Sequence, residues 1–122
     1  MRHVGGMKEE KSFAFAVRIV KAVKIIKERT REYELANQLL RSGTSIGANI
    51  SEAKYAQSDK DFVSKHKIAL KEANETKYWL RLMSATELLG EKEMKSLIND
   101  VDELMHMLTA IINTTEKKLK GK

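Results

Sequence analysis

The amino-acid sequence predicts an all-α protein, folded as an antiparallel up-and-down four-helix bundle. Three observations support this fold class. The chain contains no Pro, so nothing removes a backbone donor from a long helix. Apolar residues recur at helical spacing in four separate segments. The breaks between these segments are short, and short connections favour antiparallel neighbours.

The composition limits the class of protein further. A chain of 122 residues fits one domain with a core of its own. Hydrophobic residues make up 42% of the chain and charged residues 33%, which argues against disorder. The chain has no Cys, so it has neither a disulfide framework nor a thiolate metal site. Because we find no signal peptide and no apolar run of bilayer length, we expect a cytoplasmic protein without a membrane partner.

The domain organisation is predicted to be simple. We expect a flexible N-terminal tail over residues 1–10, with Gly5 and Gly6 as its hinge. The bundle domain then covers residues 11–119, and residues 120–122 form a C-terminal tail.

The first helix, predicted over residues 11–27, has two apolar faces. One face suits a bundle core and contains Phe15, Ala16, Ile19, Ala22, Val23 and Ile26. The other face contains Phe13, Val17 and Val20. A second apolar row predicts contact with another molecule, so we expect self-association. The alternative is a set of ordinary exposed apolar residues.

The second helix is predicted over residues 33–55. Its apolar row contains Leu35, Leu39, Ser42, Ile46, Ile50 and Ala53. Gly43 and Gly47 lie four residues apart on this helix, and each costs about 1 kcal/mol against Ala in a helix interior. We therefore expect these two glycines to mark a close helix crossing.

The third and fourth helices are predicted over residues 58–88 and 91–119. Ser58 followed by Asp61 is typical of an N-cap, and Gly90 is expected to end the third helix. In the fourth helix Met94, Val101 and Leu108 recur every seven residues, which predicts a wide stripe facing the core.

Residues with catalytic or metal-binding chemistry are sparse. Glu103 and His106 have the Glu-x-x-His spacing of bundle di-iron sites, but such sites need two pairs, and Val63 stands where a Glu paired with His66 would be. We expect His66 to be a packed, hydrogen-bonded residue. Ser42, Thr44 and Ser45 have no evident His base. The sequence thus predicts no enzyme, no catalytic residue, no metal and no cofactor.

A polar row on the second helix predicts a structural network. If the second and third helices pair antiparallel, Arg41 lies at the level of Ala73 and reaches Glu72 or Glu75. We expect a partly buried network that contains Arg41, Ser45, Asn49, Glu52, Glu72 and Glu75. The alternative is a surface ion pair worth about 0–1 kcal/mol.

The net charge of +6 is concentrated near the start of the chain. Residues 1–32 contain nine Lys and Arg against four Asp and Glu, a balance of +5. This excess predicts an attraction for RNA or DNA. The candidate nucleic-acid-binding residues are Arg18, Lys21, Lys24, Lys27, Arg29 and Arg31. The alternative is a solvated face of the kind found on many helices.

Two runs of the chain resemble a known family. Residues 38–53, QLLRSGTSIGANISEA, and residues 62–82, FVSKHKIALKEANETKYWLRL, are similar to the signature of the four-helix bundle proteins encoded in 23S ribosomal RNA intervening sequences. The resemblance implies a ring-shaped homopentamer without enzymatic activity. It also implies a relationship to the accessory protein of diversity-generating retroelements, which associates with a reverse transcriptase and with nucleic acid.

Two functional classes follow from these observations. The first is a non-enzymatic oligomeric scaffold that binds nucleic acid through the basic first helix, in a salt-sensitive manner and without sequence preference. The second is an adaptor for a protein partner such as a reverse transcriptase, with no direct role for nucleic acid and little dependence on salt.

Overall fold

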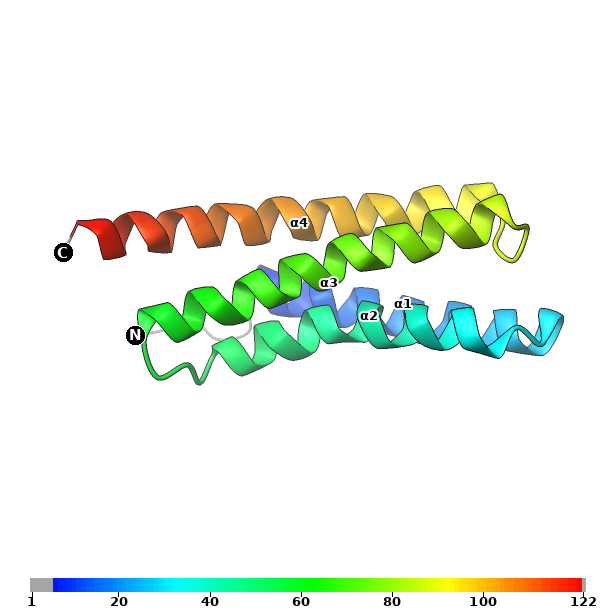
Figure 1. Ribbon diagram of the computed structural model, residues 1–122, viewed down its shortest axis with the longest axis horizontal. Coiled ribbons are helices and arrows are strands. Elements are labelled where there is room, and N and C mark those ends of the chain that lie inside the picture. Colours follow the sequence, from blue (N-terminus) through cyan, green and yellow to red (C-terminus); the bar gives the residue numbers. More distant parts are fainter. Residues whose placement is uncertain (1–5, 122) are drawn as a thin grey trace.

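The structure is a computed structural model that describes residues 6–121, and these residues fold into four α-helices. The helices are α1 (Met7–Thr30), α2 (Tyr33–Ala53), α3 (Asp59–Ala85) and α4 (Glu91–Lys120). They lie lengthwise beside one another, and successive helices run in opposite directions (Figure 1). Residues 6–121 contain no strand, so the predicted all-α four-helix bundle is confirmed.

The first helix begins earlier than the sequence pattern indicated. Gly6 is its N-cap, and Glu9 and Glu10 lie in its first turn, where the helix dipole favours carboxylates. The predicted tail is therefore wrong for residues 7–10, which are helical. Residues 1–5, with the proposed hinge at Gly5, lie outside the described part of the chain. At the C-terminal side of the domain α4 continues through Lys120, so this residue of the predicted C-terminal tail is helical.

The ends of α3 illustrate one correct prediction and one error. The Ser58 hydroxyl accepts a hydrogen bond from the Asp61 amide at 3.0 Å, which confirms the predicted N-cap. The helix ends at Ala85, before the predicted stop at Gly90. Glu87 takes the left-handed conformation with a φ of 66°, and the Leu88 amide donates to the Met83 carbonyl at 2.8 Å. Gly90 is instead the N-cap of α4.

The core lies along the bundle axis and is built from one apolar row of each helix. Most residues of the predicted rows are buried, whereas Ala16, Leu35 and Met94 are half-buried. The largest fully buried apolar side chains include Phe15, Ile19, Leu39, Ile46, Ile50, Leu80, Met83, Leu97, Leu104 and Leu108. Their removal from water is the main favourable term in folding.

Close contact between α1 and α2 depends on glycine. A Cβ placed on Gly43 would lie 2.9 Å from both Cγ atoms of Ile19, and one on Gly47 would lie 3.3 Å from the Ser12 hydroxyl oxygen. Carbon atoms in ordinary contact are about 3.5–4.0 Å apart. Two glycines one helical turn apart therefore let α1 approach the α2 backbone, as the sequence predicted.

The four helices form a square in which each contacts two neighbours. Backbones lie close together between α1 and α2, α2 and α3, and α3 and α4, and least so between α1 and α4, while α1 and α3 lie diagonally opposite and meet through side chains near the start of α1. The last turns of α4 extend past the ends of the other three helices (Figure 1). The outer faces of α1 and α3 therefore lie at opposite corners of the bundle.

Candidate functional site

The six basic residues that were predicted to bind nucleic acid do not all have unpaired charges, because Arg18 pairs with residues of α4. Its guanidinium donates to the Asp100 carboxylate at 2.7 Å and to the Ser96 hydroxyl at 3.0 Å. It also lies 3.6 Å from Glu93. Lys11 forms a further ion pair with Glu103 at 3.1 Å. Arg18 thus bridges the sparsely packed seam between α1 and α4, and its charge is compensated there.

The other five predicted cations gather toward the C-terminal end of α1. They are Lys21, Lys24, Lys27, Arg29 and Arg31, and within residues 6–121 none has a carboxylate at ion-pair distance. They do not share one face, since Lys24 and Arg29 are five residues apart and hence about 140° apart around the helix. This group is called the α1 basic end below.

A groove between the end of α1 and the start of α4 has mixed charge. Arg29 and Arg81 line it together with Glu87, Glu91 and Glu93. Carboxylates on the same surface weaken the attraction for an anion. Arg29 therefore lies in less positive surroundings than Lys21 and Lys24 on the outer face.

An apolar stripe occupies the other half of the outer face of α1. Phe13 is 70% exposed, Val17 38% and Val20 49%. These residues form the second apolar row seen in the sequence, and within the described structure no other helix covers them. This group is called the α1 apolar stripe.

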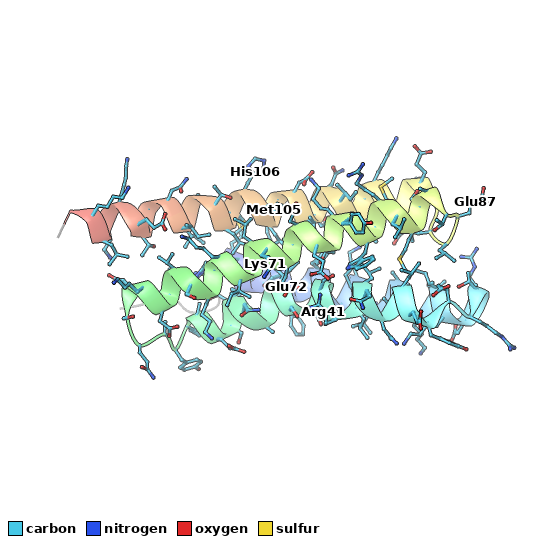
Figure 2. All side chains as sticks on the ribbon, viewed as in Figure 1. Arg41, Lys71, Glu72, Glu87, Met105 and His106 are labelled. Atoms are coloured by element: carbon cyan, nitrogen blue, oxygen red, sulfur yellow. The ribbon has the colours of Figure 1, made fainter. Side chains whose placement is uncertain are left out.

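The polar cluster predicted between α2 and α3 is present in part. One nitrogen of the Arg41 guanidinium lies 3.2 Å from the Glu72 carboxylate, and the other donates to Glu75. The Trp79 indole N–H also donates to Glu75, at 3.0 Å. Figure 2 shows Arg41 on α2 beside Glu72 on α3, with Lys71 next to them. Hydrogen bonds from Trp79 and then from Arg41 lower the pKa of the Glu75 carboxyl.

The remaining members of the predicted network are separate from Arg41. The Ser45 hydroxyl donates to the Arg41 carbonyl, and the Asn49 amide donates to the Ser45 carbonyl, so both bind backbone of their own helix. Glu52 pairs instead with Lys65 at 3.2 Å. The single six-residue network is thus corrected to a three-residue cluster, because side chains one turn apart on α2 satisfy the local backbone first.

Sequence patterns gave no sign of a buried contact between the start of α1 and α3. His66 is fully buried, its Nδ1 donates to the Phe62 carbonyl at 2.8 Å, and its Nε2 accepts from the Lys8 ammonium at 3.0 Å. Burial lowers the pKa of both His66 and Lys8. One Glu9 carboxylate oxygen is buried nearby without a hydrogen-bond partner among residues 6–121. Since 58 residues separate Lys8 from His66, no local pattern pointed to the pair.

Glu103 and His106, which have the Glu-x-x-His spacing of bundle metal sites, do not lie in a cluster of metal ligands in the described structure. Glu103 pairs with Lys11, and His106 points away from the bundle on α4 (Figure 2). Within residues 6–121 no group of three potential ligands lies close enough to hold a metal ion. In the same part of the chain, none of the helices combines the length and the apolar character needed to cross a bilayer.

These features define a small helical-bundle protein whose candidate sites are its outer faces. The sequence model of the 23S rRNA-intervening sequence protein family matches residues 9–110. The chain therefore belongs to this family, as its two signature runs predicted.

A solved structure supports the same assignment. It is the crystal structure of a protein of unknown function from the S23 ribosomal protein family of Bacteroides thetaiotaomicron VPI-5482. The two chains are 49% identical, with a TM-score of 0.86 over 87% of this chain and 98% of the other. A search of curated proteins gave no match.

Proposed function

We propose that the protein is a non-enzymatic, oligomeric scaffold that binds nucleic acid through the α1 basic end. The observation that carries this proposal is the lack of ion-pair partners, within residues 6–121, for Lys21, Lys24, Lys27, Arg29 and Arg31. Such cations neutralise phosphates of the nucleic acid and release the counterions bound there. Binding of this kind has no sequence preference, and its affinity falls as the salt concentration rises.

Self-association is the second part of this proposal. The α1 apolar stripe offers an exposed surface that a second copy of the chain can cover, and Phe13 is its most exposed member. The family resemblance favours a homopentamer. Light scattering of the intact chain measures the mass, and Phe13→Ser is expected to reduce it toward that of the monomer. A monomeric wild-type chain would remove the oligomeric part of the proposal.

Nucleic-acid binding is tested by gel shift with structured RNA and with duplex DNA over a salt series. We expect retarded complexes at low salt that dissociate as salt rises. The triple variant Lys21→Glu, Lys24→Glu and Lys27→Glu is expected to weaken both complexes. The matched control, Lys117→Glu, Lys118→Glu and Lys120→Glu on exposed positions near the end of α4, changes the net charge by the same amount at the opposite end of the bundle. Equal loss in both variants would show that only net charge matters.

A protein-binding adaptor is the second candidate function, favoured by the α1 apolar stripe. A partner such as a reverse transcriptase would cover Phe13, Val17 and Val20 in place of another copy of the chain. Apolar contacts depend little on ionic strength, so such a complex persists at high salt. A wild-type chain that binds neither RNA nor DNA at low salt would favour this candidate.

A further inference from the structure

We infer that the outer face of α3 binds single-stranded nucleic acid, with Tyr78 as the ring on which an unpaired base stacks. This inference rests on the proposed function and adds to it a second surface, at the corner of the bundle opposite α1. Four observations lead to it: the charge of the face, the engagement of the nearby carboxylates, the support of the Tyr78 ring, and a groove beside the lysines.

The fully exposed positions of α3 include cations and no carboxylate, and the partly exposed Glu75 lies beside them, four residues after Lys71. The fully exposed residues recur three or four positions apart, which places them in one stripe along the helix. They are Lys60, Ser64, Lys67, Ile68, Lys71, Asn74, Tyr78, Arg81 and Ala85. At 1.5 Å per residue the stripe from Lys60 to Arg81 is about 32 Å long. An extended polyanion can therefore follow it over several phosphates.

The carboxylates that flank this stripe are engaged elsewhere. Arg41 of α2 pairs with both Glu72 and Glu75, and the charge of Lys71 also acts on Glu75. Among the stripe's cations Lys67 pairs with Glu116 of α4 at 2.7 Å. Within residues 6–121, Lys60, Lys71 and Arg81 have no carboxylate at ion-pair distance. These three cations can therefore contact phosphates, with Lys60 and Lys71 in more positive surroundings than Arg81, which also lines the groove of mixed charge with Glu87, Glu91 and Glu93.

The Tyr78 ring is exposed but supported from below. It is 56% exposed, and its edge contact with Trp79 has a centroid distance of 5.2 Å and an interplanar angle of 73°. Trp79 is held by its hydrogen bond to Glu75, which is held in turn by Arg41. The cluster between α2 and α3 therefore acts as a support for Tyr78, and an aromatic ring held in this way is a stacking platform.

A groove between α3 and α4 continues from the stripe. Its apolar floor contains Val63, Ile68 and Leu119, and three cations, Lys60, Lys67 and Lys71, lie around it with one carboxylate, Glu116, which is paired with Lys67. Cations beside a groove, together with an exposed aromatic ring, are the combination used for single strands. Bases inside a duplex stack on one another and cannot reach a side-chain ring, so the aromatic residue favours the single strand.

The test uses the intact chain with a short, labelled RNA of mixed sequence, either single-stranded or folded as a hairpin duplex. Affinity is measured by fluorescence anisotropy. Trp79 is the one Trp of the chain, so its emission reports locally on ligand bound next to Tyr78. We expect the single strand to change Trp79 emission and the duplex to leave it unchanged.

Three variants separate stacking from charge. Tyr78→Ala is expected to weaken single-strand binding about tenfold, and Tyr78→Phe, which keeps the ring, to leave it unchanged. Tyr55→Ala is the matched control, because Tyr55 is 81% exposed and lies outside the stripe. Lys71→Glu with Arg81→Glu is expected to lower the slope of log affinity against log salt by about 0.7 for each lost phosphate contact.

Each outcome decides a separate point. Single-strand affinity that is equal in wild type and Tyr78→Ala overturns the role of Tyr78. Normal binding by every α3 variant, with loss only in the α1 variants, leaves the proposed function standing and overturns the α3 surface. If the wild-type chain binds no nucleic acid, the proposed function fails first. The inference is also overturned if the wild-type chain binds phosphatidylserine vesicles but not RNA, and Lys71→Glu with Arg81→Glu abolishes the binding to vesicles. The α3 stripe would then be a membrane-binding surface.

Discussion

Gly43→Ala offers a direct test of how α1 and α2 pack. The added Cβ would lie 2.9 Å from both Cγ atoms of Ile19, at least about 0.6 Å inside ordinary contact. Ile19 is fully buried, so it has no free space to move into, and overpacking of this kind costs about 1–3 kcal/mol. Ala is better than Gly in a helix by about 1 kcal/mol. We therefore expect a net loss of about 1 kcal/mol, or about 3–6 °C in melting temperature.

The same substitution should change sign when the clash is removed. Ile19→Ala deletes both Cγ atoms, so in that background Gly43→Ala is expected to stabilise the protein by about 1 kcal/mol. Ile19→Val keeps both Cγ atoms and is the matched control, in which the loss persists. Urea unfolding followed by circular dichroism, at one protein concentration, measures the six proteins, namely each of the three backgrounds with and without Gly43→Ala. An effect of Gly43→Ala that is the same in all three backgrounds would refute the close approach of the helices.

Three further predictions concern polar groups. Burial lowers the pKa of His66, so the folded protein binds fewer protons at this residue than the unfolded chain does. The contribution of neutral His66 to the free energy of unfolding is therefore fully present above about pH 6.5 and is lost as the pH falls below that value. Melting at pH 7 and pH 5 should show this loss in wild type and a smaller one in His66→Gln; equal losses would contradict it. Thr76→Val removes the donor to the buried Ser42 hydroxyl and should cost about 1–2 kcal/mol in urea unfolding, whereas adding Ser42→Ala should recover part of that loss. Failure of the second change to compensate would show that the two hydroxyls are independent. Arg41→Ala should lower the free energy of unfolding by about 1 kcal/mol or less, because the guanidinium is half exposed. The same variant should shift the fluorescence emission of Trp79. A loss above about 3 kcal/mol would indicate a buried ion pair instead.

Helix number and core faces could be predicted from the sequence because both depend on local periodicity. The stripe of α4 and the inner row of α1 are buried as their spacing indicated. Helix ends were less predictable, since Glu87 rather than Gly90 adopts the left-handed conformation after α3. The start of α1 at Met7 was missed because two adjacent glycines suggested a tail.

The candidate sites were predictable where one helix contained all the relevant residues, or where a short loop fixed the level of two antiparallel neighbours, as for Arg41 of α2 with Glu72 and Glu75 of α3. The exposure of Phe13, Val17 and Val20 follows from their place opposite the core row of α1. The pairing of Arg18 with Asp100 could not be predicted in this way, because it depends on how α4 lies against α1.

The sequence by itself determined an all-α chain, the four amphipathic segments and the excess of positive charge, because these are properties of residue type and spacing. Only the tertiary structure decided which charges remain available. It compensates Arg18 across one seam, brings Glu72 and Glu75 to Arg41 across another, and leaves Lys60, Lys71 and Arg81 on the outer face of α3 without an ion-pair partner among residues 6–121. Ion pairs between helices depend on distances of a few ångströms between residues far apart in the chain, and packing of the core sets those distances.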